Sequence, residues 1–379
     1  MIKGLAIFPH YTVTGKQTIK AVVETENGVF SASVPFGTST GANEAARISA
    51  DAAISMSASL AKQLVGQPED FRQVEAILKE LDGTPNLAKL GANLILAIAL
   101  ATARAQTANR LYSILPSPGT FPIPVVNTIG GAQHGGGTDW QEFLLIPHKA
   151  ASPAEAFQTV WEAYLAVGAA LRAKGVMVGI NKEHAYTARL DDLQTLELLD
   201  GIAGQYGLLL GIDFAASGIW DGRQYSYAAM NRKLMPESHL EFVENTAKSF
   251  KRLFFLEDAV HEEDFQGMAE LTARLKGRLI VGDDIYCTNP ARLEQGIKLQ
   301  ASNAIIIKPD QIGTLTDTMW TVEIAQQADL ELVPSHRSNE TSDDWLADLA
   351  LAFGARYIKI GVGYDVPKHN RLVEAWQAR

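Results

Sequence analysis

The segment LIVGDDIYCTNP (279–290) sets a pattern that much of the chain repeats. Three apolar β-forming residues and a glycine lead directly into two adjacent carboxylates, Asp283 and Asp284. Because an isolated charge in an apolar interior is very costly, such groups are exposed, paired or bound to a cation. By itself the segment predicts either a strand that leaves the core in a polar turn or a strand that ends at a cation site.

Eight further apolar runs of this kind lie around it, and amphipathic segments such as 239–252 and 316–329 separate some of them. Nearly continuous apolar strands that alternate with helices predict parallel β-strands buried on both faces. That many units in about 260 residues favour a closed (β/α) barrel over an open sheet. The further runs are PVVNTI (124–129), FLLIP (143–147), VMVGI (176–180), LLLGIDF (208–214), RLFFLED (252–258), AIIIKP (304–309), LVPSHRS (332–338) and YIKIGV (357–362).

The first part of the chain predicts a small α+β unit in front of this barrel. Residues 1–34 offer three strand-like runs. Helical spacing follows in three segments, at 43–66, 70–81 and 88–112. The segment LPSPGTFPIP (115–124) then holds four prolines in ten residues, which is typical of a domain boundary. We therefore predict an α/β protein with an N-terminal α+β capping domain at 1–117 and a barrel at 118–379 that carries the active site.

The composition and net charge of the chain argue against some classes of binding partner. The chain has 379 residues, of which 47% are hydrophobic and 20% charged, an ordinary globular balance. The formal net charge of -10 argues against a nucleic-acid or anionic-membrane partner that binds by electrostatic attraction. An anionic substrate stays compatible with this charge, because a bound divalent cation reverses the local field.

The sequence carries no feature of a secreted or membrane protein. One cysteine, Cys287, rules out an intramolecular disulfide framework and fits a reducing cytosol. The first residues, MIKGLAIFPHYTV (1–13), lack the apolar core and cleavage site of a signal peptide. The most apolar stretch, LILAIALATA (94–103), is too short to span a bilayer. These features predict a soluble cytoplasmic protein.

Polar residues follow six of the apolar runs. Barrel enzymes assemble their active sites at the carboxyl ends of the strands, so this repetition predicts a site rather than a set of structural turns. The residues are Asp213, Glu257 with Asp258, Asp283 with Asp284, Lys308, His336 with Arg337 and Ser338, and Lys359.

The residue types at these strand ends predict three kinds of chemistry. Three carboxylates, Asp213, Glu257 and Asp283, supply the hard oxygen ligands that Mg²⁺ prefers. A lysine beside such a cation has a lowered pKa and can act as a base near neutral pH, which suits Lys308 and Lys359. A guanidinium and a hydroxyl form a good phosphate clamp, which the segment 336–338 offers. The set predicts metal-assisted chemistry on a phosphorylated or carboxylated small molecule.

With these residues in place, the chain resembles the enolase family over almost its whole length. Its motifs follow in the family's order, and the last four are highly specific. The first resembles the family's mobile N-terminal loop, the second its Gly-Ala-Asn helix and the third its Gln-Glu-Phe segment. The motifs are VPFGTSTGANEA (34–45), GANLILAIALATARA (91–105), VVNTIGGAQHGGGTDWQEFLLIP (125–147), GIDFAAS (211–217), FLEDAV (255–260), VGDDIYCTNP (281–290), IIIKPDQIGTLTDT (305–318) and PSHRSNETSDDWLADLALAFGARYIKIG (334–361).

The resemblance implies a small N-terminal domain on an enolase-type modified (β/α)8 barrel, dependence on Mg²⁺ and usually a homodimer. It implies the glycolytic interconversion of 2-phosphoglycerate and phosphoenolpyruvate, in which Lys308 removes the proton α to the carboxylate and Lys359 assists. Ser39 would close over the substrate and help to bind a second Mg²⁺. The implied catalytic residues are Lys308, Lys359, His336, Glu142 and Glu183; the implied substrate-binding residues are His134, Gln141, Glu142, Arg337, Ser338, Lys359 and Ser39; the implied metal ligands are Asp213, Glu257, Asp283 and Ser39.

Two segments depart from the family pattern. After the strand at 176–179, enolases carry an Asp-Glu-Gly-Gly turn whose glutamate helps to expel the β-hydroxyl. This chain reads INKEHAY (180–186), where no glutamate aligns without a gap. Either Glu183 reaches the site after a local insertion or its role is lost, and the gap slightly favours loss. Near the N-terminus, PHYTVTGKQT (9–18) replaces an Asp-Ser-Arg-Gly-Asn-Pro stretch, which puts lid geometry and dimerisation in question.

Other functions are compatible with parts of the sequence. A divergent homologue would keep the enolate step and act on a related phosphorylated or phosphonate carboxylate, with carboxyphosphonoenolpyruvate synthase as the comparison. GTSTG (37–41) matches the nucleophile elbow of a serine hydrolase, although a glycine-rich lid explains it better. A non-enzymatic binding role fits a lost glutamate but not the retained pair of lysines. The triple glycine at 135–137 predicts a flexible loop tip, and a phosphate cradle is the weaker alternative.

Overall fold

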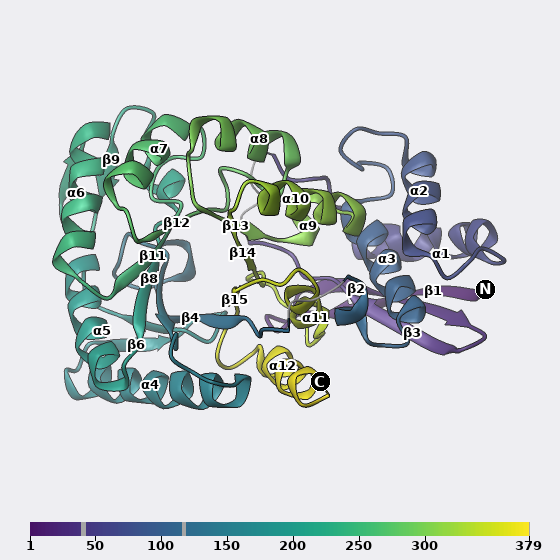
Figure 1. Ribbon diagram of the computed structural model, residues 1–379, viewed down its shortest axis with the longest axis horizontal. Coiled ribbons are helices and arrows are strands. Elements are labelled where there is room, and N and C mark those ends of the chain that lie inside the picture. Colours follow the sequence, from purple (N-terminus) through teal and green to yellow (C-terminus); the bar gives the residue numbers. More distant parts are fainter. Residues whose placement is uncertain (39–42, 116–118, 379) are drawn as a thin grey trace.

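The computed structural model describes residues 1–38, 43–115 and 119–378. A small antiparallel sheet with its helices lies at one end of the long axis, and a larger α/β unit fills the other end (Figure 1). The predicted domain boundary at 117 and 118, and Ser39 of the predicted lid, lie outside the described residues.

The N-terminal unit is a three-stranded antiparallel sheet in the order β1-β2-β3, packed against helices. Helix α3 is buried along nearly its whole length, because it lies between this sheet and helices of the barrel. The elements are β1 (Ile2–Tyr11), β2 (Gln17–Thr25), β3 (Gly28–Ser33), α1 (Ala50–Leu64), α2 (Phe71–Asp82) and α3 (Ala92–Gln106).

Three strands and three helices agree with the sequence-based expectation, but two helix ends were wrong. The helix predicted at 43–66 begins only at Ala50, because the Ser49 hydroxyl accepts a hydrogen bond from the Ala52 N–H and caps the first turn. The helix predicted at 88–112 ends at Gln106, because Ala108 and Asn109 adopt left-handed backbone conformations.

The larger unit is a closed barrel. Its strands pair in the order β14-β13-β12-β11-β8-β5-β4, and β15 pairs with β4. A parallel bridge between Ser335 and Lys359 joins the two ends and completes the ring. The strands are β4 (Ile123–Gly130), β5 (Glu142–Ile146), β8 (Leu209–Asp213), β11 (Leu253–Glu257), β12 (Leu279–Gly282), β13 (Ala304–Ile307), β14 (Glu331–Pro334) and β15 (Tyr357–Lys359).

One barrel strand contradicts the expectation of parallel pairing. Strand β5 runs antiparallel to both of its neighbours, β4 and β8. The segment between β4 and β5 holds one short helical turn, η2 (Ala132–His134), and is too short for the crossover that parallel strands need. Since β5 is reversed, its first residue, Glu142, lies at the face where the neighbouring strands end.

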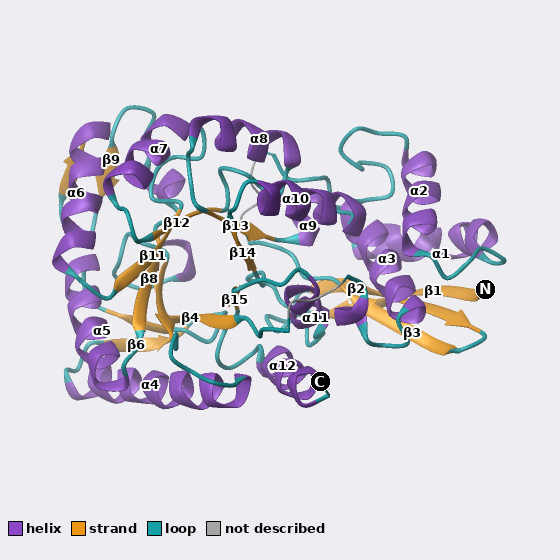
Figure 2. Ribbon diagram, in the orientation of Figure 1, coloured by secondary structure: helices purple, strands orange, loops and turns teal. Residues whose placement is uncertain are grey.

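Helices surround the barrel (Figure 2), one hairpin extends its sheet, and another hairpin forms a separate two-stranded sheet. The hairpin of β6 (Met177–Ile180) and β7 (Tyr186–Ala188) pairs with β4, and β9 (Tyr225–Tyr227) pairs with β10 (Arg232–Leu234). The remaining helices are η1 (Leu111–Ser113), α4 (Pro153–Ala173), α5 (Asp192–Tyr206), η3 (Ala216–Ile219), α6 (Pro236–Ser249), α7 (Phe265–Arg274), α8 (Pro290–Leu299), α9 (Pro309–Ile312), α10 (Leu315–Gln327), α11 (Trp345–Ala352) and α12 (Val366–Gln377).

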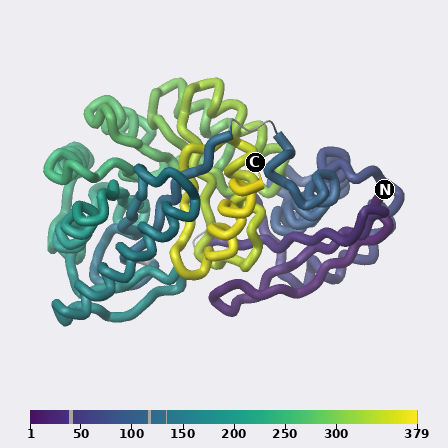
Figure 3. Tube along the Cα trace, turned by 60° about the horizontal axis from the view of Figure 1, so that its bottom comes forward, coloured from purple at the N-terminus to yellow at the C-terminus, as the bar shows by residue number. Residues whose placement is uncertain are grey.

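Apolar side chains fill the inside of the barrel. Val125, Leu144, Phe255, Val281 and Ile306 belong to one buried cluster contributed by five different strands. Within the described residues, no helix is both long and apolar enough to cross a membrane. The C-terminal helix α12 lies near the middle of the molecule, between the barrel and the N-terminal unit (Figure 3).

Candidate active site

A cavity of about 430 Å³ opens where the barrel strands end. Most of the site residues predicted from the sequence line it, and they reach it from nine separate places in the chain. Glu257 is an exception: it is fully buried and does not line the cavity. The lining residues among the predicted set are His134, Gln141, Glu142, Glu183, Asp213, Asp258, Asp283, Asp284, Lys308, His336, Arg337, Ser338 and Lys359.

Lys359 is surrounded by three carboxylates. The register of β5, β8 and β11 places Glu142 opposite Asp213, and Asp213 opposite Glu257, so the three side chains form a row. The Lys359 ammonium lies 3.0 Å from Glu142 Oε2, 3.0 Å from Asp213 Oδ2 and 2.7 Å from Glu257 Oε2. A single ammonium group therefore compensates part of the charge of three carboxylates.

Lys308 forms the second lysine–carboxylate contact of the site. Its ammonium donates to Asp283 Oδ2, and the side-chain amide of Gln311 donates to Asp283 Oδ1 over 3.1 Å. Together with the row around Lys359, four buried carboxylates face two ammonium groups, which leaves an excess of two negative charges when all are ionised. This excess equals the charge of one divalent cation.

The pKa values reflect this crowding of charge. Burial alone would lower the pKa of Lys308, but the adjacent Asp283 carboxylate raises it above its ordinary value. Burial likewise opposes the charge of Lys359, yet Asp213 and Glu142 raise its pKa well above the ordinary value. The lowered lysine pKa expected from the sequence applies to a lysine beside a bound cation, and it stays a prediction, because these raised values describe the site with both ammonium groups facing only carboxylates.

The three predicted metal ligands lie at the same face but do not form one compact group. Lys359 bridges Asp213 and Glu257, while Asp283 is held by Lys308. Burial and repulsion from Asp213 raise the pKa of Glu257 well above its ordinary value, and Glu257 Oε1 has no hydrogen-bond partner among the described residues. These hard oxygen donors, with an excess of negative charge, fit a divalent cation.

Within the described part of the chain, two other groups of side chains bring their ligand atoms within 4.8 Å of one another. The first is Asp258, Asp283 and Asp284, in which the carboxylate of Asp258 accepts hydrogen bonds from the backbone N–H groups of the other two. Asp258 thereby fixes the turn after β12. This contact shows how the doubled carboxylate of the 279–290 segment is held in the structure.

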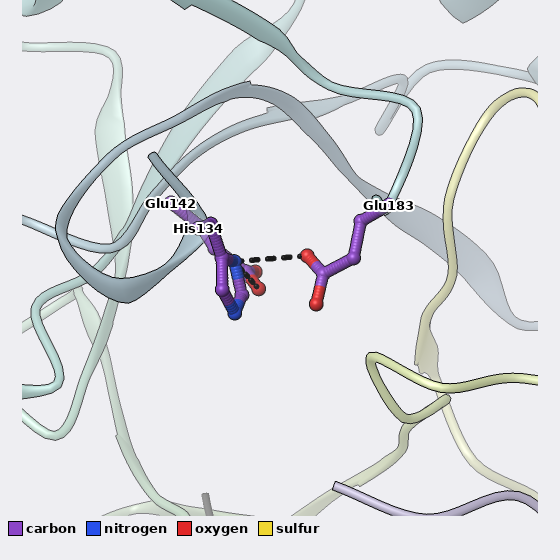
Figure 4. A group of neighbouring side chains, drawn as sticks. All are labelled: His134, Glu142 and Glu183. Atoms are coloured by element: carbon purple, nitrogen blue, oxygen red, sulfur yellow. Dashed lines mark ion pairs between the residues drawn. The ribbon is translucent and has the colours of Figure 1, made fainter. Parts of the chain in front are cut away.

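The second group is His134, Glu142 and Glu183, which point toward one another across the cavity (Figure 4). His134 Nδ1 lies 3.0 Å from Glu183 Oε2 and 3.6 Å from Glu142 Oε1. Asn127 donates to Glu183 Oε2 over 2.9 Å. The turn at 180–186 thus brings Glu183 into the site, whereas the alignment gap had slightly favoured loss of its role.

The pKa values of the three side chains in this second group are shifted in different directions. Burial opposes ionisation of Glu183, but the neighbouring His134 lowers its pKa to about 2. Burial opposes the charge of His134 as well, and Glu183 raises its pKa above the ordinary value. Burial raises the pKa of Glu142. These directions favour an ionised Glu183 beside a proton carried by His134 or Glu142.

The phosphate clamp predicted after β14 is oriented by buried acids. Arg337 Nη2 lies 3.1 Å from both carboxylate oxygens of Glu44, and Arg337 Nη1 lies 3.2 Å from Asp310 Oδ2. His336 Nδ1 contacts Asp365 Oδ2 at 2.5 Å. Burial opposes the charge of His336, but Asp365 raises its pKa. Both side chains are therefore held in fixed directions.

Several of these residues were not predicted from the sequence. Glu44, Asp310 and Asp365 hold the clamp, and Gln311 holds Asp283, but their side chains meet the site only through contacts distant in the chain. Asp310 and Gln311 lie two and three residues after Lys308, and this nearness is the one signal that could have indicated them. The triple glycine at 135–137 is exposed and does not line the cavity, as expected of a loop tip.

A closed barrel with buried lysines and carboxylates at its strand ends defines a barrel enzyme with an acid–base site. The family model "Enolase, N-terminal domain" matches residues 2–115, and "Enolase, C-terminal TIM barrel domain" matches residues 118–375. The chain belongs to the enolase family.

Curated relatives agree with this assignment. The enolase of Methanocorpusculum labreanum is 37% identical over 383 residues, which cover 95% of this chain and 94% of that protein. The enolase of Archaeoglobus fulgidus is 36% identical over 385 residues, with 96% and 95% covered. The enolase of Elusimicrobium minutum is 32% identical over 394 residues, with 96% and 92% covered. The chain is thus a carbon–oxygen lyase, which contradicts the serine-hydrolase and non-enzymatic alternatives.

Proposed function

We propose that the chain catalyses the reversible dehydration of 2-phosphoglycerate to phosphoenolpyruvate, a step of glycolysis, with Mg²⁺ as its cofactor. The observation that carries the proposal is the buried contact between Lys308 and Asp283, which places a potential base beside a potential metal ligand. The relatives named enolase favour this substrate over the phosphonate alternative.

Asp213, Glu257 and Asp283 are the proposed ligands of Mg²⁺. The unpartnered Glu257 Oε1 and the excess of two negative charges support a divalent cation at this place. When bound, Mg²⁺ would offset the charge of these carboxylates and of the substrate carboxylate.

Lys308 is the proposed base. Its amine takes the proton from the carbon α to the substrate carboxylate, and the electron pair of that C–H bond forms the new C=C bond. The reaction needs a neutral amine, so the Asp283 charge that raises the pKa of Lys308 has to be offset first. Lys359 keeps its proton and donates hydrogen bonds within the row of carboxylates.

The group His134, Glu142 and Glu183 is the proposed acid. Loss of the β-hydroxyl breaks a C–O bond, and the leaving hydroxide takes one proton and departs as water. The support for this role is that all three side chains line the cavity and that His134 Nδ1 lies 3.0 Å from Glu183 Oε2, so a proton carried by the group would be near the leaving hydroxide. This role restores to Glu183 the function that the sequence left open.

The rest of the site would bind the substrate. Arg337 and Ser338 grip the phosphate, and His336 and Gln141 line the cavity beside it. The roles of Ser39 as a lid residue and as a ligand of a second Mg²⁺ are proposed from the family resemblance alone. Cytoplasmic location and a homodimer are further parts of the proposal that rest on the family.

A coupled assay of phosphoenolpyruvate formation tests the proposal. We expect turnover of 2-phosphoglycerate that stops with a chelator and returns with added Mg²⁺. A matched titration with a phosphonate carboxylate serves as the control for substrate class. Turnover of the phosphonate without turnover of 2-phosphoglycerate would replace the proposed substrate by the alternative.

A further inference from the structure

Thr38 lies at the edge of the cavity, where the N-terminal unit meets the barrel. Its backbone N–H donates to Ser338 Oγ over 2.8 Å, and its hydroxyl lies 2.8 Å from the same oxygen. The side-chain amide of Asn339 donates to the Thr38 hydroxyl over 3.3 Å. Thr38 is therefore fastened to the segment that carries the proposed phosphate clamp.

Lys182 reaches the same hydroxyl from a third segment. It lies on the turn between β6 and β7, directly before Glu183, where the family's turn has an aspartate before its glutamate. Its ammonium donates to Thr38 Oγ1 over 2.7 Å. Among the described residues, no carboxylate forms an ion pair with Lys182, so its ammonium brings a positive charge to Thr38, which lines the cavity.

Arg337 brings little net positive charge to this end of the cavity. Its guanidinium is paired with Glu44 and with Asp310, two carboxylates against one positive charge. A phosphoryl group carries up to two negative charges and needs positive charge to leave water. Among the described residues, Lys182 is an ammonium that reaches this end of the cavity through a hydrogen bond and has no ion-paired carboxylate.

We propose that Lys182 is a positioning residue of the anion site, which holds Thr38 against Ser338 and supplies the positive charge that the paired Arg337 lacks. The occupant is the phosphoryl group of the substrate, so the inference rests on the proposed function. The site then unites three segments of the chain: residues 37–38, the β6–β7 turn and the segment after β14.

Four single variants and one double variant test this inference. Lys182→Met removes the charge and the hydrogen bond, and Lys182→Arg keeps both. Thr38→Val removes the hydroxyl but keeps the backbone N–H bond to Ser338, and it is also combined with Lys182→Met. Lys174→Met removes an exposed lysine at the end of α4 and is the matched control. Calorimetry with inorganic phosphate and with phosphoenolpyruvate measures Kd, and 2-phosphoglycerate turnover measures KM and kcat.

We expect Lys182→Met to raise the Kd for both ligands and the KM at least about tenfold, as for a lost hydrogen bond to a charged group. The kcat should change far less than the KM. Lys182→Arg should restore most of the binding, and Thr38→Val and Lys182→Met should not add in the double variant, because they break one contact.

Different results would contradict the anion site at Lys182 and the proposed substrate, 2-phosphoglycerate. Phosphate binding that depends on Lys182 in a protein without 2-phosphoglycerate turnover would support the anion site and contradict only the proposed substrate. Lys182→Met with a Kd and a KM like those of Lys174→Met would overturn the inference. A wild-type protein that binds neither phosphate nor phosphoenolpyruvate would overturn it too.

Discussion

The Lys359 ammonium and the three carboxylates around it compensate one another's charges in the buried site. The Lys359 side chain is 3% exposed, and its ammonium contacts Glu142, Asp213 and Glu257. Removing one partner from a buried charge group leaves an uncompensated charge, which is strongly destabilising. Single substitutions here change the charge balance of the whole site, so variants that keep shape and change charge are the informative ones.

Asp283→Asn is such a variant. It keeps the size of the side chain and removes one of the two excess negative charges, so we expect Mg²⁺ affinity to fall at least about tenfold, which is about 1.4 kcal/mol. Isothermal calorimetry with Mg²⁺ measures this. Asp329→Asn, at an exposed left-handed position that asparagine tolerates, is the matched control. Equal Mg²⁺ affinity in both variants would contradict the ligand assignment.

Arg337→Ala tests the phosphate clamp. We expect a cost of roughly 2–5 kcal/mol in phosphoenolpyruvate binding, as found when one partner of a buried charge pair is truncated. Arg337→Lys keeps the charge but not the planar fork, so it should recover only part of the affinity. Calorimetry measures the affinities and thermal unfolding checks the fold. Wild-type affinity in Arg337→Ala would remove this residue from the site.

At the scale of elements, Glu75 of α2 joins the N-terminal unit to α10 of the barrel. Its carboxylate accepts hydrogen bonds from the backbone N–H groups of Leu315 and Thr316 and from the Thr316 hydroxyl. These groups lie at the first turn of α10, where N–H groups have no partner within the helix. Burial raises the pKa of Glu75 to about 8, although these hydrogen bonds lower it.

This raised pKa makes the stabilisation by Glu75 pH-dependent. The protonated form is favoured in the folded state, so its contribution is fully present below a pH of about 4.5 and is lost as the pH rises through about 8. We expect the free energy of unfolding of the wild type to fall relative to Glu75→Gln over this window. Denaturant unfolding at several pH values measures it, and a difference independent of pH would contradict the shift.

Much of the element order could be predicted from the sequence, because apolar runs and helical spacing are local signals. The three N-terminal strands and the nine apolar runs correspond to strands. The reversal of β5 could not be predicted from its apolar run, since a buried strand has the same composition in either direction. The connection before it was the signal, because it has no crossover helix.

Some residues of the candidate site could likewise be predicted from the sequence, and others could not. Residues at strand ends, such as Asp213 and Lys308, were predicted because their position follows from the strand itself. Glu44 was not, since it meets Arg337 across 293 residues of sequence. The carboxylates that raise the pKa values of both lysines could not be identified from the sequence either, because these shifts depend on which charges face the ammonium groups in space.

At the scale of the whole molecule, the N-terminal unit and the barrel complete one site together. Thr38 and Glu44 come from the N-terminal unit and contact Ser338 and Arg337 of the barrel. Helix α3 packs against α9, which begins directly after Lys308. Gly313 ends α9 with φ +84, and a Cβ there would lie 2.5 Å from that of Ala92. The close approach of the two units thus fixes the segment that carries the proposed base.

Exchange of the α-proton of 2-phosphoglycerate in D₂O, followed by NMR together with phosphoenolpyruvate formation, tests the central claim most directly. With saturating Mg²⁺, the wild type should exchange and eliminate, Lys308→Met should do neither, and Glu183→Gln should exchange without eliminating. These results would assign proton removal to Lys308 and departure of the hydroxyl to the Glu183 group. A wild type that does neither, or a Lys308→Met variant that still exchanges, would contradict the account.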